Sequence, residues 1–192
     1  MPDKRTAQSI PREAQPVPRD VPTIPQEVLS QCALFREMGD VDRQRVIELL
    51  EPREFPAGEA ILQEGQAVQS LWIVVRGKCQ VVKQMRGGVE QELAVLEPHS
   101  VFGEMSFFHP GPHSATIRAL TDVELLRLDR GGYSALLECC HTAACKLAVN
   151  IVGVLSERLR RMDDWVCEHN ARGKQKEEWD EFRAKLYSGW QF

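Results

Sequence analysis

Short apolar runs separated by turn residues fill the middle of the chain, and this alternation limits the possible folds more than any other feature. The clearest runs are residues 71–75, 79–83, 92–96 and 123–128. Turns that need a positive φ are marked by Gly58, Gly65 and Gly77, and Gly87 followed by Gly88 is typical of a hairpin. Short strands interrupted at this spacing indicate an antiparallel roll over residues 51–130.

Helical segments flank the predicted roll. Residues 26–50 carry apolar side chains at helical spacing, with a break at Gly39, and Asp40 or Asp42 can cap the second helix. Residues 131–164 are predicted to form a hinge and a long helix, with an interruption near residues 141–143. The predicted fold class is therefore mainly β with helical flanks. It is a jelly-roll-like antiparallel β-roll (double-stranded β-helix) with N-terminal helices and a long C-terminal helix.

The two ends of the chain differ in composition from the predicted domain. Residues 1–25 are rich in proline and poor in large apolar side chains, so we expect a disordered tail. Residues 165–192 combine aromatic side chains with dense, balanced charge, and apolar positions at helical spacing there could dock on the roll or on a partner: Trp179, Phe182, Leu186 and Trp190.

Charge and hydropathy exclude some classes of partner. The net charge is −4 and the isoelectric point is about 5.8, which gives no electrostatic footprint for nucleic acid. No apolar run is long enough for a membrane-spanning helix, and the polar, proline-rich start does not resemble a secretion signal. We therefore expect a cytoplasmic protein that acts on neither membrane nor nucleic acid.

Metal binding and catalysis are not expected either. Cys139, Cys140, His141 and Cys145 lie close in sequence, but no CxxC pair is present, and adjacent cysteines on a helix point in different directions. Reduced, mostly packed thiols are the expected state. No phosphate-binding Walker loop, zinc signature or activated nucleophile is recognisable, so we expect neither an enzyme nor a cofactor.

Residues 101–120 carry the most specific local pattern. Phe102-Gly103-Glu104 places a glycine before a carboxylate at the start of a short apolar run. A helical turn that begins at a glycine presents unpaired N–H groups suited to an anion, and the carboxylate can accept hydrogen bonds from a sugar hydroxyl. Two prolines and a glycine in residues 109–113 then break regular structure, and residues 114–120 return to a strand pattern.

These residues in this order resemble the phosphate-binding cassette of the cyclic-nucleotide-binding domain family. The resemblance lies in FGEMSF at residues 102–107 and in Pro112, Ser114, Ala115, Thr116 and Ile117 within the cassette at residues 101–119. The helical lead-in at residues 33–50 and the turn glycines are also similar to the family, so the likeness extends over residues 34–159. It implies a β-roll that binds cyclic AMP or cyclic GMP as a ligand.

The resemblance also implies roles for individual residues. Glu104 would bind the ribose 2′-hydroxyl, and the backbone at Gly103, Met105 and Ser106 would face the phosphate. The Ser114 hydroxyl, beside Ala115, would add a further contact. His113 stands where the family has the arginine that pairs with the cyclic phosphate.

That departure at His113 has a physical cost. Arginine offers a permanent charge and two parallel donors, whereas histidine is shorter and largely uncharged near neutral pH. Losing one charge-assisted contact costs about 1.5–3 kcal/mol, or roughly ten- to a hundredfold in affinity. A bound phosphate could raise the pKa of His113 and tighten binding at acid pH. The alternative is that His113 is a solvated loop residue with no contact to a ligand.

The long helix carries an apolar stripe that suits either the roll or a second helix. Its later part places Ala148, Val152, Leu155, Leu159 and Met162 at alternating spacings of four and three, widened by Ile151 and Val154. The first half is expected to pack on the roll. The segment 148–162 could form a homodimer, and Asn150 at the edge of the stripe either sets the register or is exposed.

Two functions follow from the sequence. The first is a sensor that binds a cyclic nucleotide or a related small anionic ligand and passes the signal through its C-terminal helix to an unknown effector protein. The second is a roll that no longer binds ligand and serves in dimerisation or protein interaction. A transcription factor of this family would carry a helix-turn-helix domain after the long helix, and residues 165–192 are too short and too neutral for one.

Overall fold

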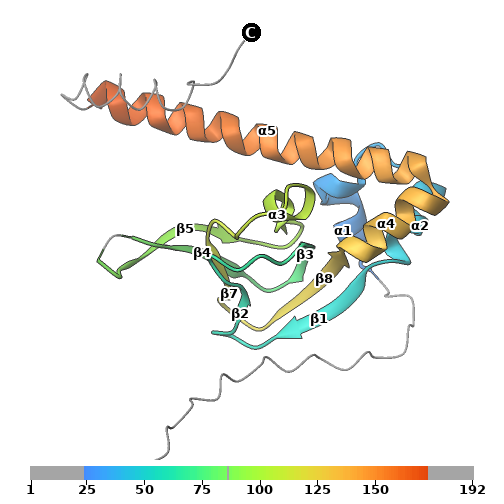
Figure 1. Ribbon diagram of the computed structural model, residues 1–192, viewed down its shortest axis with the longest axis horizontal. Coiled ribbons are helices and arrows are strands. Elements are labelled where there is room, and N and C mark those ends of the chain that lie inside the picture. Colours follow the sequence, from blue (N-terminus) through green and yellow to red (C-terminus); the bar gives the residue numbers. More distant parts are fainter. Residues whose placement is uncertain (1–23, 86, 173–192) are drawn as a thin grey trace, which may run out of the picture.

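The structure is a computed structural model that describes residues 24–85 and 87–172, and its centre is a roll of eight strands (Figure 1). The strands form two four-stranded antiparallel sheets, in the orders β1-β8-β3-β6 and β2-β7-β4-β5. Their bounds are β1 Glu51–Phe55, β2 Ala60–Leu62, β3 Ser70–Arg76, β4 Cys79–Gln84, β5 Glu90–Leu96, β6 Val101–Phe102, β7 Thr116–Ala119 and β8 Val123–Asp129. The predicted antiparallel β-roll with helical flanks is confirmed.

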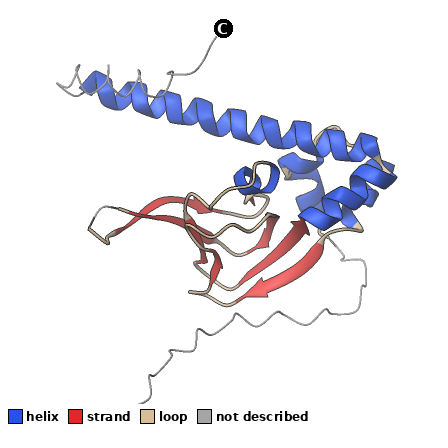
Figure 2. Ribbon diagram, in the orientation of Figure 1, coloured by secondary structure: helices blue, strands red, loops and turns tan. Residues whose placement is uncertain are grey.

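Helices lie on one side of the roll and at one end of it (Figure 2). They are α1 Gln26–Gln31, the 3₁₀ turn η1 Ala33–Phe35, α2 Asp40–Ile47, α3 Glu104–Phe108, α4 Arg130–Cys139 and α5 His141–Arg172. The predicted break falls at Cys140, between α4 and α5, and α5 continues past residue 164. The predicted aspartate cap of α2 is wrong: Gly39 occupies the N-cap, Asp40 is the first helical residue, and Asp42 pairs with Lys146 instead.

Strand β3 is buried on both faces, which explains why its sequence is apolar at consecutive positions. Leu71 and Ile73 face the helices, where they join a core that includes α4 and α5. Trp72 and Val74 face the opposite way, into the interior of the roll. A strand that is buried on both faces needs apolar residues at every position. The helices are therefore packed on the outer surface of the first sheet.

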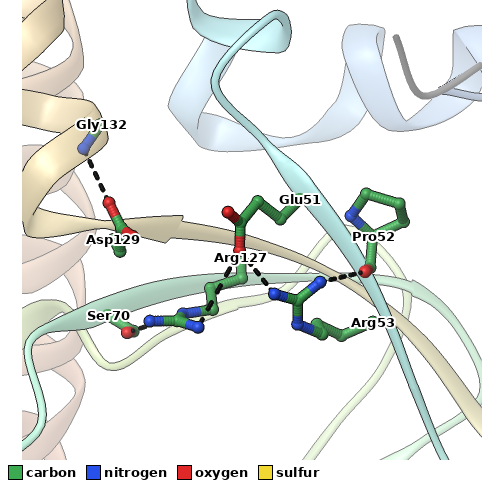
Figure 3. Close-up of polar contacts among 7 residues, drawn as sticks. All are labelled: Glu51, Pro52, Arg53, Ser70, Arg127, Asp129 and Gly132. Carbon is green, nitrogen blue, oxygen red and sulfur yellow. Dashed lines mark hydrogen bonds and ion pairs between the residues drawn. The ribbon is translucent and has the colours of Figure 1, made fainter. Parts of the chain in front are cut away.

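The junction between the roll and the C-terminal helices is built from polar contacts (Figure 3). Arg127 on β8 donates to Ser70 Oγ at 3.0 Å and lies 3.9 Å from the Glu51 carboxylate. Two residues later, Asp129 accepts a 2.7 Å hydrogen bond from the Gly132 N–H and so caps α4. The end of the closing strand thus fixes where α4 begins.

The first half of helix α5 is held by the helical core and by residues from the start of the domain. Ala144, Leu147 and Ile151 are buried in the helical core. Asn150 Nδ2 donates to the carbonyls of Leu34 at 2.8 Å and Arg36 at 2.9 Å, so Asn150 is not merely exposed, and its role in the register of a helix pair stays a prediction. In Figure 1, α5 runs across the molecule with α3 between it and the strands.

The cysteines divide into two groups. Cys32 and Cys79 are packed, and burial raises the pKa of each thiol to about 11. Cys139, Cys145 and Cys167 are exposed, so the expectation of mostly packed thiols is wrong for these three. In the described part of the chain, no three potential metal ligands come together, and no helix is both long and apolar enough to cross a membrane. The aromatic positions predicted at residues 179–190 lie outside the described residues.

Candidate functional site

The cassette predicted from sequence forms a strand, a tight turn and a short helix. Gly103 links β6 to α3 with a φ of +81°, and a Cβ at this position would lie 2.3 Å from the Ser70 carbonyl oxygen. No side chain fits there, so the glycine is a steric requirement of the turn. The turn starts α3 at Glu104, whose neighbouring N–H groups have no acceptor inside the helix.

A pocket of about 450 Å³ opens between the cassette, the second sheet and α5. It is lined by all seven residues that the sequence analysis selected, namely Gly103, Glu104, Met105, Ser106, His113, Ser114 and Ala115. Apolar side chains from β2, β4, β5 and β7 form much of the remaining wall, together with Phe102. The pocket is thus partly apolar and partly polar, as small-molecule sites generally are.

Glu104 is the buried charge of this pocket, with only 4% of its surface exposed. Its carboxylate oxygen Oε1 accepts a hydrogen bond from Arg158 Nη1 of α5, and Arg158 Nη2 donates to the Val101 carbonyl. A buried carboxylate without a cation would be costly, so this ion pair stabilises both the cassette and the position of α5. The predicted contact of Glu104 with a ribose hydroxyl must therefore coexist or compete with Arg158.

His113 is also buried, at 7% exposure, so the interpretation of a solvated loop residue is wrong. Its backbone is fixed from both sides: the His113 N–H donates to Gln66 at 2.8 Å, and the His113 carbonyl accepts from Gly65 at 2.9 Å. These bonds hold the segment against the loop at residues 65–66. The fixed backbone places the imidazole inside the pocket wall.

The imidazole of His113 is poorly suited to carry charge. Nδ1 lies 3.0 Å from Ser106 Oγ, whereas Nε2 is buried without a hydrogen-bond partner in the described part of the chain. Burial lowers the pKa of His113 below its ordinary value of 6.5. The ring is therefore mostly neutral at pH 7, and it offers the pocket one unsatisfied nitrogen instead of a cation.

The two serines of the cassette have different surroundings. Ser106 Oγ is close to His113 and also lies 3.2 Å from the Val68 carbonyl and 3.3 Å from the Gly103 carbonyl. That hydroxyl serves the protein itself, which leaves the Ser106 backbone N–H for a ligand. Ser114 is exposed, and its hydroxyl approaches Met105 Sδ at 3.8 Å, the one hydrogen-bond contact it has among the described residues. Its hydroxyl can therefore turn toward a ligand.

Two charged pocket residues were missed by the sequence analysis. Arg158 and Arg161 reach the pocket from α5, well after the end of the cassette in sequence. Nothing local marks them, because arginines on the polar face of an amphipathic helix are normally solvated. Only the path of α5 over the cassette brings them to this site.

Comparison with known proteins agrees with this geometry. Residues 52–139 match a family model described as cyclic nucleotide-binding domain. The chain is 34% identical over 130 residues to the cyclic AMP receptor protein of Thermus thermophilus, which covers 68% of this chain and 58% of that protein. It is 26% identical over 138 residues to the CRP-like cAMP-activated global transcriptional regulator of Mycobacterium tuberculosis, with 72% of this chain and 60% of that protein covered.

A solved structure shows the same architecture. The crystal structure of Thermus thermophilus catabolite activator protein superposes with a TM-score of 0.65 at 32% identity, and the match covers 72% of this chain and 63% of that one. The chain spans about three fifths of the length of both curated relatives. The likeness therefore concerns the roll and its flanking helices.

Proposed function

Because residues 52–139 form a domain of the cyclic nucleotide-binding family, we propose that this chain is a cytoplasmic sensor that binds a cyclic nucleotide and relays its presence through α5 to a partner protein. Domains of this family are regulatory and not enzymatic. The curated relatives are by name a cyclic AMP receptor and a cAMP-activated regulator. The pocket lined by the seven cassette residues supports the same kind of ligand for this chain.

The observation that carries the relay is the ion pair between Glu104 and Arg158. Glu104 belongs to the cassette and Arg158 to α5, so one contact joins the pocket to the helix. A ribose hydroxyl that donates to Glu104 changes the strength or geometry of that ion pair. A ligand shifts a conformational equilibrium only through such differential contacts, and this pair provides one.

The proposed role of the remaining cassette residues follows from their places in the pocket wall. The ribose would lie against Glu104, and the cyclic phosphate would face the backbone of Gly103, Met105 and Ser106. Ser114 would add its exposed hydroxyl. His113 would contact the ligand through its unsatisfied Nε2, with less affinity than an arginine would give.

A second function is favoured by the outer surface of α5. Val152, Leu159 and Met162 are 61%, 49% and 53% exposed, which is unusual for three large apolar side chains on one helix. If the neutral His113 prevents ligand binding, the roll would act as a scaffold whose α5 pairs with a second copy or another protein. Dimerisation through residues 148–162 is compatible with both functions.

Calorimetric titration of the full chain with cyclic AMP and cyclic GMP at pH 7.5 tests the sensor. We expect micromolar or tighter binding of at least one nucleotide, and a loss of roughly tenfold or more in Glu104→Gln, because a hydrogen bond to a charged group is removed. Glu92→Gln is the matched control, since Glu92 is exposed on β5 outside the pocket. Absence of binding of both nucleotides to the wild type would contradict the sensor and favour the scaffold.

A further inference from the structure

The charges of the pocket do not balance. Its lining contains one carboxylate, from Glu104, and two guanidinium groups, from Arg158 and Arg161. The Arg158 guanidinium is already engaged by Glu104 and by the Val101 carbonyl. The only other ionisable group in the lining, His113, is mostly neutral because burial lowers its pKa. The pocket wall therefore carries a net positive charge that belongs to Arg161.

Arg161 is positioned to use that charge on a ligand. It follows Arg158 by one helical turn, so the two side chains leave the same face of α5 about 4.5 Å apart along the helix axis. No carboxylate pairs with Arg161 among the residues that the structure describes. A guanidinium that reaches a partly apolar pocket without a partner is complementary to an anion, particularly to a phosphate with its several acceptor oxygens.

We propose that Arg161, on α5, holds the negative charge of the ligand, in place of a cation from the cassette loop. This inference rests on the proposed function and adds the location of the charge. The ligand class is a nucleotide or another small molecule with a phosphate-like anion. The cassette would bind the sugar through Glu104 and face the phosphate with its backbone, and α5 would supply the positive charge through Arg161.

This division has a consequence for the relay. A ligand held by Glu104 on one side and by Arg161 on the other bridges the roll and the helix directly. Recognition of the anion and the change at α5 are then one event. An uncharged analogue would reach the helix only through the pair of Glu104 with Arg158.

The test compares cyclic AMP with adenosine, which keeps the base and ribose but lacks the phosphate. Both are titrated into the full chain at pH 7.5, as wild type, Arg161→Gln and Arg160→Gln. Arg160 is the matched control, because it lies next to Arg161 on the same helix, is exposed and does not line the pocket. We expect the wild type to prefer cyclic AMP over adenosine by about tenfold or more, the gain of one charge-assisted contact.

Arg161→Gln should lose about tenfold in affinity for cyclic AMP and change its affinity for adenosine by less than about twofold, while Arg160→Gln changes neither. Equal losses of cyclic AMP affinity in the two variants would overturn the inference, since both would then act only through net charge. Cyclic AMP binding that is unaffected by Arg161→Gln would overturn it and leave the proposed function intact. If the wild type bound neither compound, the proposed function would fail together with this inference.

Discussion

At the scale of single residues, the distinctive feature of this pocket is His113, which stands where the resemblance to the family implies an arginine. Sequence alone left two interpretations, a weak phosphate contact or a solvated loop residue. The backbone bonds to Gln66 and Gly65 exclude the solvated loop residue, because they hold the segment in the pocket wall, and the phosphate contact stays a prediction. Those partners lie in a loop more than forty residues earlier in the chain, so no local pattern could have indicated the burial.

Restoring an arginine at position 113 should strengthen nucleotide binding. His113→Arg supplies a permanent charge beside the backbone of the cassette, and we expect cyclic AMP affinity to rise by roughly ten- to a hundredfold. Calorimetry of the variant against wild type measures the change. His109→Arg is the control, because His109 is exposed in the same loop and outside the pocket lining. A folded His113→Arg protein with unchanged affinity would show that position 113 does not face the ligand.

The lowered pKa of His113 also predicts how stability varies with pH. In the unfolded chain the imidazole takes up a proton near its ordinary pKa of 6.5, but in the folded protein burial holds the pKa below that value. Between these two values the unfolded state binds more protons. The stabilising contribution is therefore complete above pH 6.5 and is lost as pH falls through the folded pKa.

Urea unfolding of the ligand-free protein at pH 7.5, 6.5 and 5.5 measures this dependence. We expect wild type to lose more stability over this range than His113→Gln, whose side chain does not titrate. A parallel pH dependence of the two proteins would exclude His113 as the source. The acidic groups with lowered pKa values, including Asp42 and Glu64, titrate at lower pH and contribute little in this range.

At the scale of elements, α5 is the part of the fold that contacts the most distant segments. Ile151 of its buried face was named in the sequence analysis but Leu147 was not, and both lie in the helical core. Its polar anchors were not predictable: Lys146 pairs with Asp42 at 2.7 Å, and Asn150 bonds the carbonyls of residues 34 and 36. A sequence pattern reports which face of a helix is apolar, but it does not report which distant atoms that face will meet.

The contact between Arg158 and Glu104 should behave as a coupled pair in stability measurements. Arg158→Ala leaves a buried carboxylate without its cation, and we expect a loss of about 1–3 kcal/mol in the free energy of unfolding. The double variant with Glu104→Gln should recover part of that loss, because the unpaired charge is then gone. Chemical denaturation of the single and double variants gives the coupling energy. Strictly additive losses would mean that the two side chains do not interact in solution.

At the scale of the whole molecule, the roll with its turn glycines and flanking helices could be predicted from the alternation of apolar runs. Gly58, Gly65 and Gly77 all have positive φ values, between +82° and +89°, as their turns require. The set of residues around the pocket could be predicted only for the continuous cassette. Arg158 and Arg161 join it through the tertiary course of α5, which depends on packing against η1, α2 and α4 and not on any motif.

Dimerisation through α5 remains a prediction that solution measurements can check. Charge introduced into the exposed stripe by Leu159→Glu should weaken association, because it opposes burial of Val152, Leu159 and Met162 in a pair of helices. Light scattering after size exclusion should show a dimer for wild type and a monomer for the variant. Val41→Glu serves as control, since Val41 is 73% exposed but lies on α2. A monomeric wild type at about 100 μM would contradict the prediction, because that concentration exceeds a micromolar dissociation constant.

The ion pair between Arg158 and Glu104, which joins α5 to the cassette, also affects the rate at which a ligand binds. If the ribose competes with Arg158 for Glu104, entry must wait for an opening of the helix that the ligand does not cause. Binding limited by such a step is slower than simple collision. In a stopped-flow experiment the observed rate should therefore level off as ligand concentration rises, and Arg158→Ala should raise that plateau. The same pair that stabilises the resting protein would set how quickly the sensor responds.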